Sequence, residues 1–282
     1  MTDKGMPREG RRDASDMGRP LPPGVDPSIP SPARMYDYYL GGKDNYEADR
    51  IAAENALSVV PCGRRIAQAN RYFLMRAVVL MADEGIKQFI DLGTGIPTRP
   101  SVHEVAQAIQ PAARVLYVDN DAVVTAHNRA LLAKTKGIEA LQADIRETAA
   151  ILASPELRRL IDFTQPVGVL FVAVLHFIPD SSDPHGTVAA FTSRMAPGSY
   201  LALSHITSDG ADADVMEVIQ QVYATASAPA VFRSGEEIRE FFSGYELLPP
   251  GLADLAKWYP YLATISATPP VLPVLAGIGR RI

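Results

Sequence analysis

The chain has 282 residues, of which 47% are hydrophobic, which suffices for a globular core and excludes a wholly disordered protein. Its formal net charge of −5 argues against a protein whose main work is binding nucleic-acid phosphates, because that work needs a basic surface. No nucleic-acid partner is therefore expected. Cys62 is the only cysteine, so no internal disulfide can form and nothing indicates an oxidising compartment.

No stretch of the sequence has the features of an export signal or a membrane anchor. Residues 1–20 are rich in charges and lack the apolar core of a signal peptide. The longest apolar run, residues 167–175, is far shorter than the ~20 residues that span a bilayer. We therefore expect a cytoplasmic protein with no membrane partner.

The first 86 residues form two predicted segments. Residues 1–31 are polar and then rich in proline, a composition that cannot bury enough surface to order itself, and we predict a flexible tail. Residues 32–86 begin with a tyrosine-rich arm, 33–46, that suits neither a plain helix nor a plain strand. Two helices are expected after it, at 47–57 and 64–82. The arm either covers the core with its tyrosines or acts as a lid over a flat ligand.

Residues 87–282 alternate between predicted strands and helices. Strands are expected at 88–92, 114–118, 138–143, 167–174 and 200–206, with a closing pair at 245–248 and 271–278. The alternation predicts an α/β fold with a doubly wound, mainly parallel, seven-stranded Rossmann-like sheet, and the N-terminal helices form a cap over it. We expect residues 32–282 to form one structural domain, in which 87–282 are the core.

Acids and glycines gather at the ends of the predicted strands, where ligands bind in a doubly wound sheet. The first strand ends at Asp91 and runs into Gly93-Thr94-Gly95, whose glycines let the backbone approach a ligand. Asp119 ends the second strand, where an acid can accept two hydrogen bonds from a ribose diol. Asp144 ends the third strand and can accept one from an adenine amino group. Asp121 is better explained as a helix cap.

Two cofactor classes compete for these strand ends. A dinucleotide enzyme usually shows Gly-x-Gly-x-x-Gly, with a pyrophosphate at the helix start, but here Thr98 stands at the third glycine position. Asp91 stands two residues before the first glycine, where a carboxylate repels a pyrophosphate and attracts the ammonium of an amino acid. S-adenosylmethionine carries an adenosine at one end and an amino acid at the other. It therefore accounts for Asp91 as well as Asp119.

The segments 91–95, 117–121 and 142–144 resemble the cofactor motifs of class I S-adenosylmethionine-dependent methyltransferases. In addition, 33–45, 89–98 and 172–180 are similar to a family of methyltransferases common in actinomycetes, and the match runs from about residue 31 to residue 280. The resemblance implies the class I methyltransferase fold, whose sheet ends in an antiparallel hairpin, and S-adenosylmethionine as cofactor. It implies no particular acceptor.

The resemblance also implies a role for each matching residue. Gly93, Thr94 and Gly95 would face the methionine portion, Asp91 its amino group, Asp119 the ribose hydroxyls, Asn120 the adenine side, and Asp144 with Ile145 the adenine ring. The arm lies outside the shared core, and its Tyr39, Asp44 and Asn45 are further candidates for cofactor binding if the arm closes as a lid. Arg71 is interpreted as a solvated charge in preference to a carboxylate ligand. No metal site is expected.

Two histidines at strand ends are the catalytic candidates. Methyl transfer needs alignment and, for a hydroxyl acceptor, a base that removes its proton. The segment 175–180 looks like the one that holds the catalytic histidine of small-molecule O-methyltransferases. The alternative for His176 is a hydrogen bond that supports the cofactor pocket. His205, at the end of the neighbouring strand, can share either role.

The function predicted from the sequence is that of an S-adenosylmethionine-dependent methyltransferase. Its acceptor is expected to be a small molecule or natural product, methylated on oxygen or nitrogen. Two alternatives stay open at this point, a non-catalytic S-adenosylmethionine-binding regulatory protein and an NAD(P)-dependent oxidoreductase. The sequence indicates neither the acceptor nor the oligomeric state.

Overall fold

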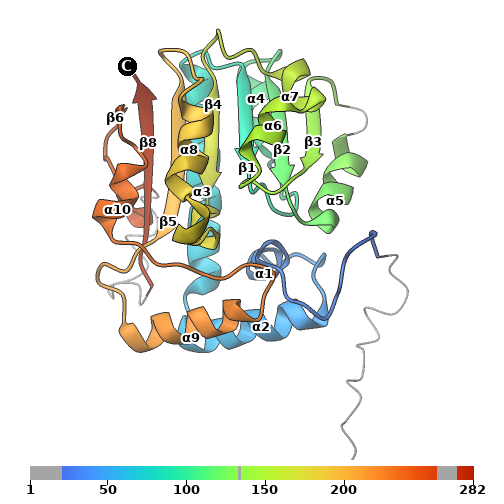
Figure 1. Ribbon diagram of the computed structural model, residues 1–282, viewed down its shortest axis with the longest axis vertical. Coiled ribbons are helices and arrows are strands. Elements are labelled where there is room, and N and C mark those ends of the chain that lie inside the picture. The colour runs from blue at the N-terminus through green and yellow to red at the C-terminus, as the bar shows by residue number, and fades with distance from the viewer. Residues whose placement is uncertain (1–20, 133–134, 259–271) are drawn as a thin grey trace, which may run out of the picture.

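The computed structural model describes residues 21–132, 135–258 and 272–282, so most of the predicted tail lies outside the described residues (Figure 1). The α-helices are α1 (Pro32–Tyr39), α2 (Glu47–Val59), α3 (Gly63–Asp83), α4 (Val102–Ile109), α5 (Ala122–Leu132), α6 (Thr148–Ala153), α7 (Pro155–Leu160), α8 (Pro184–Thr192), α9 (Ala213–Ala224), α10 (Gly235–Glu240) and α11 (Leu255–Trp258). The strands are β1 (Gln88–Leu92), β2 (Arg114–Asp119), β3 (Ile138–Gln142), β4 (Gly168–Val172), β5 (Tyr200–Ile206), β6 (Tyr245–Leu247), β7 (Ala253–Asp254) and β8 (Val274–Arg281).

One sheet runs through the molecule in the order β3-β2-β1-β4-β5-β8-β6, and the short β7 pairs with β8. Strands β1 to β5 are parallel, whereas β8 runs antiparallel to β5 and β6. The strand order reverses between β1 and β4, which is where such sheets bind ligands. The predicted doubly wound α/β fold is confirmed, and so is its closing antiparallel pair.

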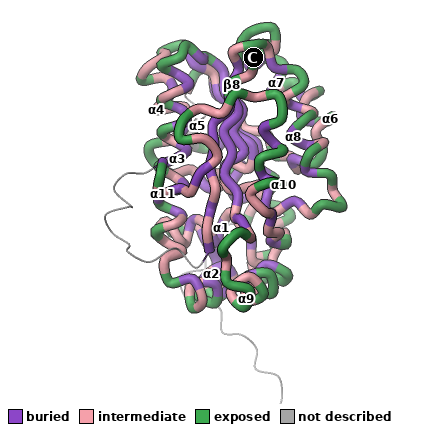
Figure 2. Tube along the Cα trace, turned by 90° about the vertical axis from the view of Figure 1, so that its left-hand side faces the viewer, coloured by how far each residue is buried: buried purple, intermediate pink, exposed green. Residues whose placement is uncertain are grey.

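Helices cover both faces of the sheet, and Figure 2 shows the buried strands between them. On one face, α3 and α4 pack against Phe89 and Tyr117, and on the other α6, α7, α8 and α10 pack against Ile90 and Leu92. Successive side chains of a strand point to opposite faces. Asp91 therefore shares the face of Phe89, toward α3.

The fourth strand ends two residues earlier than the sequence predicts. Ala173 has φ 56, in the left-handed region, and its N–H donates to Ser204 Oγ at 2.9 Å. The chain then turns into a short 3-10 helix, Leu175–Phe177, instead of continuing along the sheet. A non-glycine residue in this conformation is strained, and such strain is common at functional sites.

The tyrosine-rich arm begins with a helix, which the sequence did not predict. Pro32 occupies the first turn of α1, where its missing N–H costs no hydrogen bond, and Met35 is fully buried. Figure 1 shows α1 below the carboxyl ends of the parallel strands, between the sheet and the antiparallel helices α2 and α9. The arm thus covers the edge of the sheet where ligands bind.

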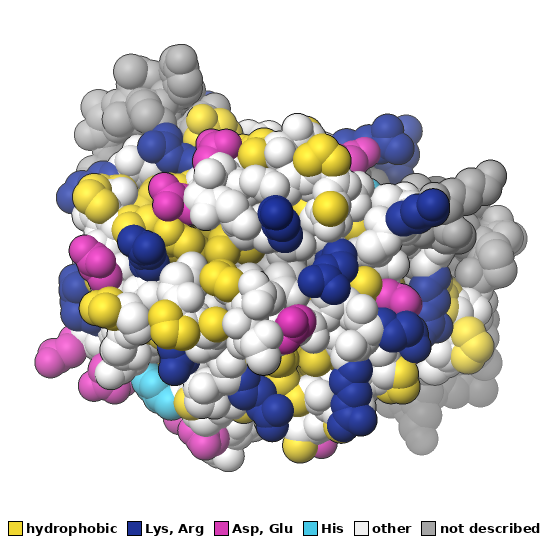
Figure 3. Space-filling view, turned by 90° about the horizontal axis from the view of Figure 1, so that it is seen from above, with side chains coloured by type: hydrophobic (Ala, Val, Ile, Leu, Met, Phe, Trp, Pro, Cys, Tyr) yellow, Lys and Arg dark blue, Asp and Glu magenta, His cyan; other side chains and the backbone are white. Residues whose placement is uncertain are grey.

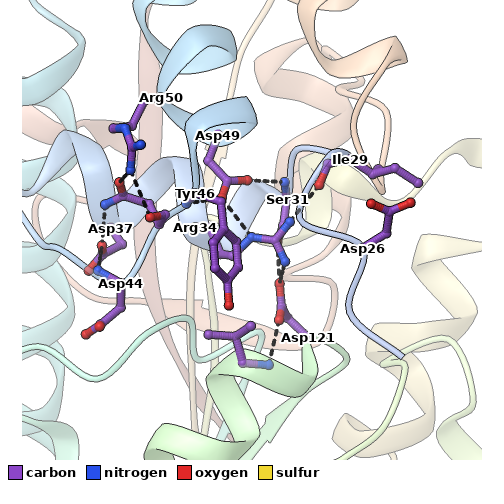
Figure 4. A network of polar contacts seen from close by, with 12 residues as sticks. Asp26, Ile29, Ser31, Arg34, Asp37, Asp44, Tyr46, Asp49, Arg50 and Asp121 are labelled. Atoms are coloured by element: carbon purple, nitrogen blue, oxygen red, sulfur yellow. Dashed lines mark hydrogen bonds and ion pairs between the residues drawn. The ribbon is translucent and has the colours of Figure 1, made fainter. Parts of the chain in front are cut away.

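A buried ion-pair network fixes this arm to the sheet (Figure 4). The Arg34 guanidinium donates from Nε to Asp49 Oδ2 at 2.9 Å and from Nη1 to Asp121 Oδ2 at 3.3 Å. Asp49 also accepts from the backbone N–H groups of Ser31 and Tyr46, both at 2.8 Å. Asp121 caps α5, as predicted, because its Oδ1 accepts from the N–H of Val123. One guanidinium therefore joins α1, α2 and the end of β2.

Figure 3 shows the end of the molecule opposite to α1, where Lys, Arg, Asp and Glu side chains are scattered among uncharged ones. None of the described helices is both long enough and apolar enough to cross a membrane.

Replacing Arg34 should destabilise the protein strongly. Arg34→Ala leaves the Asp49 carboxylate, whose side chain is 0% exposed, without its cation. We expect the free energy of unfolding to fall by about 3–5 kcal/mol in urea titrations at pH 7.5. The control is Arg159→Ala, which breaks an exposed pair with Glu139 and should cost no more than about 1 kcal/mol. Equal small losses in both variants would contradict a structural role for Arg34.

Candidate functional site

A cavity of about 180 Å³ lies at the carboxyl ends of the parallel strands, and we call it the strand-end cavity. Its lining includes eight residues that the sequence predicts to bind the cofactor: Asp91, Gly93, Thr94, Gly95, Asp119, Asn120, Asp144 and Ile145. Ser31, Pro32, Ala33 and Tyr36, at the start of the arm, line it as well. The structure therefore brings three separate strand ends together under α1.

The glycine turn after β1 needs both of its glycines. Gly93 and Gly95 have φ of 71 and 67, which residues with a Cβ rarely adopt. A Cβ on Gly93 would lie 2.2 Å from Cγ2 of Val174, so the turn and the loop after β4 are in close contact. A Cβ on Gly95 would meet nothing within 4 Å, so this glycine borders open space. The turn leaves room for a ligand beside its backbone.

Two buried carboxyl groups face this cavity. Asp91 is 3% exposed and accepts from the Thr94 hydroxyl at 2.8 Å, and burial raises its pKa to about 6. Asp119 is 6% exposed and accepts from the N–H groups of Asp121 and Gly95, and burial raises its pKa to about 7. A bound cation or hydroxyl donor would relieve part of this desolvation cost. Both carboxyl groups can therefore accept hydrogen bonds from a ligand in the cavity.

The third strand end is more exposed. Asp144 forms a forked pair with Arg146, at 2.5 Å from Nη2 to Oδ2, and hydrogen bonds from Arg146 hold the pKa of Asp144 below its usual value. Ile145 is 8% exposed and supplies an apolar surface next to this carboxylate. An ionised acid beside an aliphatic wall suits a flat ring with an amino group at its edge.

Arg71 on α3 is a functional candidate, because its guanidinium is largely buried and is not the solvated charge predicted from the sequence. Its Nη2 donates to the carbonyls of Thr98 and Pro100, at 2.6 and 2.5 Å, while its buried Nε has no hydrogen-bond partner among the described residues. Burial lowers the pKa of Arg71, and the nearby Asp91 carboxylate raises it. Arg71, Asp91 and Thr94 line the strand-end cavity and also a neighbouring cavity of about 220 Å³. A cation and an acid therefore lie together beside the glycine turn.

The sequence of α3 also contains a polar residue, Asn70, within the apolar stripe that faces the sheet. The predicted apolar stripe includes Ile66, Phe73, Leu74 and Ala77, and Asn70 stands four residues from both Ile66 and Leu74. Asn70 is 4% exposed and lines the strand-end cavity next to Arg71. A polar residue within a buried stripe, followed by an arginine, is typical of a helix face that meets a ligand site.

A second cavity of about 100 Å³ lies between the arm, α2, α3 and α9, and we call it the cap cavity. It shares five lining residues with the strand-end cavity: Pro32, Tyr36, Asn70, Ala173 and Phe177. The rest of its lining is mostly aliphatic and aromatic and includes Ile219 and Tyr223 of α9. The two cavities are therefore neighbours that meet at the strained residue Ala173.

His176 lines the cap cavity and is 4% exposed. Its Nδ1 is buried and has no hydrogen-bond partner within the described part of the chain. Burial, aided by the charges of His205 and Arg233, holds the pKa of His176 well below its usual value, so the ring is neutral. The ring packs against Phe177 with centroids 4.4 Å apart. His176 thus offers a free ring nitrogen next to the cap cavity.

His205 lies in a different environment, although it contacts His176 edge to face at 5.3 Å. It is 0% exposed, its Nδ1 lies 2.6 Å from the carbonyl of Ile206, and its Nε2 lies 2.8 Å from Nη1 of Arg233. Burial lowers its pKa to about 3. His205 is not among the described residues that line either cavity. Both of its nitrogens have partners within the protein, Ile206 in β5 and Arg233, so we do not assign it a catalytic role.

The three arm residues predicted to bind the cofactor lie apart from the strand-end cavity. Tyr39 lines the cap cavity instead. Asn45 is buried, and its amide donates to Asp37 Oδ2 at 2.8 Å and to the carbonyl of Gly42 at 3.1 Å. Asp44 lies 3.7 Å from His127 on the surface. Asn45 and Asp44 therefore hold the turn after α1, and neither is among the described residues that line the two cavities.

The chain matches the family model described as S-adenosyl methyltransferase over residues 19–282. Among solved structures, it is similar to a candidate methyltransferase of Thermobifida fusca YX, with 39% identity, a TM-score of 0.85, and coverage of 92% of this chain and 97% of that chain. It is also similar to a DUF574 family protein of Streptomyces avermitilis, with 38% identity, a TM-score of 0.84, and coverage of 91% and 99%. No curated protein matches it.

The family match spans nearly the whole described chain, including the arm and the closing strands. It agrees with the acids at three successive strand ends and with the two-glycine turn, which together suit a ligand with an adenosine and an amino acid. The cofactor is S-adenosylmethionine, and the oxidoreductase and regulator alternatives are not favoured. The chain belongs to the S-adenosyl methyltransferase family.

Proposed function

We propose that this protein transfers the methyl group of S-adenosylmethionine to a small-molecule acceptor bound in the cap cavity. The observation that carries the proposal is the junction of the two cavities at Tyr36, Asn70 and Ala173. A non-catalytic binder needs only the strand-end cavity, whereas a transferase needs room for a second molecule next to the cofactor. The cap cavity supplies that room.

We assign the amino-acid end of the cofactor to the corner beside the glycine turn. Asp91 accepts from the ammonium group, and the unpartnered Nε of Arg71 donates to the carboxylate. These two side chains are already charge partners in the folded protein, which supports a paired zwitterion site. Gly93, Thr94 and Gly95 allow the chain of the methionine portion to pass close to the backbone.

The adenosine end is assigned to the next two strand ends. Asp119 accepts from the ribose hydroxyls, and Asn120 lies toward the adenine. Asp144 accepts from the adenine amino group while Ile145 packs against the ring. All four residues line the strand-end cavity, which supports this order along the strand ends.

His176 is proposed to take the proton of a hydroxyl acceptor on its imidazole ring. S-adenosylmethionine supplies a methyl carbon on a positively charged sulfur, which keeps the carbon–sulfur electron pair when the acceptor oxygen takes the methyl. The acceptor hydroxyl becomes strongly acidic as its oxygen forms the new bond, so a neutral base of low pKa suffices. The His176 ring is neutral and lines the cap cavity, which favours an oxygen acceptor over a nitrogen acceptor.

Asp119→Ala should weaken binding of S-adenosylhomocysteine by about 1–3 kcal/mol, or roughly 5- to 150-fold, because two ribose hydrogen bonds are lost. Titration calorimetry at pH 8 measures this change. Glu139→Ala, at an exposed position of β3, serves as the control and should bind as the wild type does. Unchanged affinity in Asp119→Ala would contradict the ribose assignment.

The affinity of the wild type for S-adenosylhomocysteine should also decrease when the pH is lowered. The pKa of Asp119 is about 7 in the free protein, so the carboxylate predominates above pH 7 and the carboxyl below it. If the ligand selects the carboxylate, affinity drops by about tenfold between pH 8 and pH 6. Calorimetry of wild type and Asp119→Asn across this range tests the sign, because the variant should lose most of the dependence. If the affinities of both proteins depend on pH with the same slope, a group other than Asp119 causes the dependence.

Arg71→Met should weaken S-adenosylhomocysteine about 10- to 100-fold, since a charged hydrogen bond to a carboxylate contributes about 1.5–3 kcal/mol. Methylthioadenosine lacks the amino-acid end, so its affinity should change less than threefold. Arg76→Met, an exposed position on the same helix, is the matched control. Equal losses for both ligands would show that Arg71 supports the loop and not the carboxylate.

His176→Ala should leave S-adenosylhomocysteine affinity within twofold of wild type and slow methyl transfer by about 10²- to 10⁴-fold. Transfer is measured with methyl-labelled cofactor against small hydroxylated and amino-substituted aromatic compounds. His185→Ala, an exposed histidine on α8, is the control. A large loss of cofactor affinity in His176→Ala would instead assign His176 to the support of the cofactor pocket.

A further inference from the structure

The cap cavity has no charged wall. None of its described lining residues is Asp, Glu, Lys or Arg, and its polar side chains are Tyr36, Tyr39, Tyr223, Asn70 and His176. An ion that enters such a site loses its water without gaining a counter-charge, which is costly. The cavity therefore selects an uncharged occupant.

Most of the polar atoms around the cavity already have partners. The Tyr36 hydroxyl donates to the carbonyl of Ala67 at 2.9 Å and accepts from Asn70 Nδ2 at 3.0 Å. Asn70 Oδ1 in turn accepts from Ser204 Oγ at 2.6 Å. The His176 ring also lines the cavity, and its buried Nδ1 has no hydrogen-bond partner among the described residues. The occupant therefore needs one hydrogen-bond donor, and that donor is a hydroxyl if the ring nitrogen is its acceptor and its base.

The size and lining of the cavity limit the rest of the molecule. An apolar cavity of about 150 Å³ holds a benzene ring, so the cap cavity, at about 100 Å³, admits no more than one ring. Aromatic side chains line it, and Phe177 and Tyr223 lie with their ring centroids 5.2 Å apart. Aromatic walls favour a flat ring through edge and face contacts.

We propose that the acceptor is an uncharged phenol with a single ring in the cap cavity and its hydroxyl on the imidazole of His176. This inference rests on the proposed function, because it treats the cap cavity as the acceptor site. It adds the substrate class, which the family match does not contain. Substituents of the ring can extend toward the strand-end cavity, where Tyr36, Asn70 and Ala173 form the junction.

The test measures binding, not turnover. The protein is saturated with S-adenosylhomocysteine, and phenol, toluene, benzoate and benzylammonium are titrated by protein-observed NMR. We expect phenol to bind at least tenfold more tightly than each of the other three, because toluene lacks the donor and the two ions lack a counter-charge. Benzoate or benzylammonium binding as tightly as phenol would overturn the inference.

Two variants locate the phenol. Ala56 is 4% exposed on α2 and lines only the cap cavity of the two, so Ala56→Leu fills it and should weaken phenol at least tenfold. His176→Leu should remove the preference for phenol over toluene, and this readout survives if Ala56→Leu does not fold. Tyr72→Phe, on the exposed face of α3, is the control. Phenol binding that neither variant changes would also overturn the inference.

Failure of the proposed function gives a different result. If S-adenosylhomocysteine does not bind, or if its affinity is insensitive to Asp119→Ala, the cofactor assignment itself is wrong. If it binds as expected in wild type and in both cap-cavity variants, while phenol shows no preference over the two ions, only the acceptor class is wrong.

Discussion

Both cavities depend on the placement of Arg34 between two carboxylates. Arg34, which is 4% exposed, places its guanidinium between Asp49 of α2 and Asp121 at the start of α5. A buried charge is tolerated only where it is paired and hydrogen-bonded, so this network admits few other positions of the arm. Because α1 supplies the roof of the strand-end cavity and one wall of the cap cavity, the arm docks where the two cavities meet.

Beneath the arm lie buried polar groups that have lost their hydration without gaining enough partners within the protein. Burial raises the pKa values of Asp91 and Asp119, and the buried nitrogens Nε of Arg71 and Nδ1 of His176 have no hydrogen-bond partners in the described residues. Such groups reduce stability in the empty protein and gain interactions when a complementary ligand binds. The network of His205 and Arg233, by contrast, is internally complete and supports the loop after β4.

The sequence predicted the fold well because strands, turns and caps are local patterns. The period-2 and period-3.6 patterns placed the strands of the parallel sheet, and strand ends of a parallel sheet necessarily share an edge. For that reason Asp91, Asp119 and Asp144 could be grouped before their distances were known. Contacts between segments that are distant in the sequence could not be predicted from such local patterns. Arg34 and Asp121 are 87 positions apart, and neither residue shows a pattern that predicts the other.

The same limit explains the arm. Its composition indicated tyrosines near a ligand, but not which tyrosines face which cavity. The side chain of Asn45 closes the turn after α1 and that of Asp44 lies beside His127 on the surface, whereas Tyr36 and Tyr39 turn inward. Arg71 was undervalued because a helical arginine is usually solvated, and only the surrounding fold shows that its Nε is buried.

The central claim is that the methyl-bearing sulfur of the cofactor faces the cap cavity across the junction of Tyr36, Asn70 and Ala173. A crystal structure of the complex with S-adenosylhomocysteine tests it most directly. The account predicts adenine beside Asp144 and Ile145, ribose on Asp119, the carboxylate near Arg71, and the sulfur at that junction. A sulfur atom directed to solvent, or an adenosine bound beside the glycine turn with the amino acid toward Asp144, would contradict it.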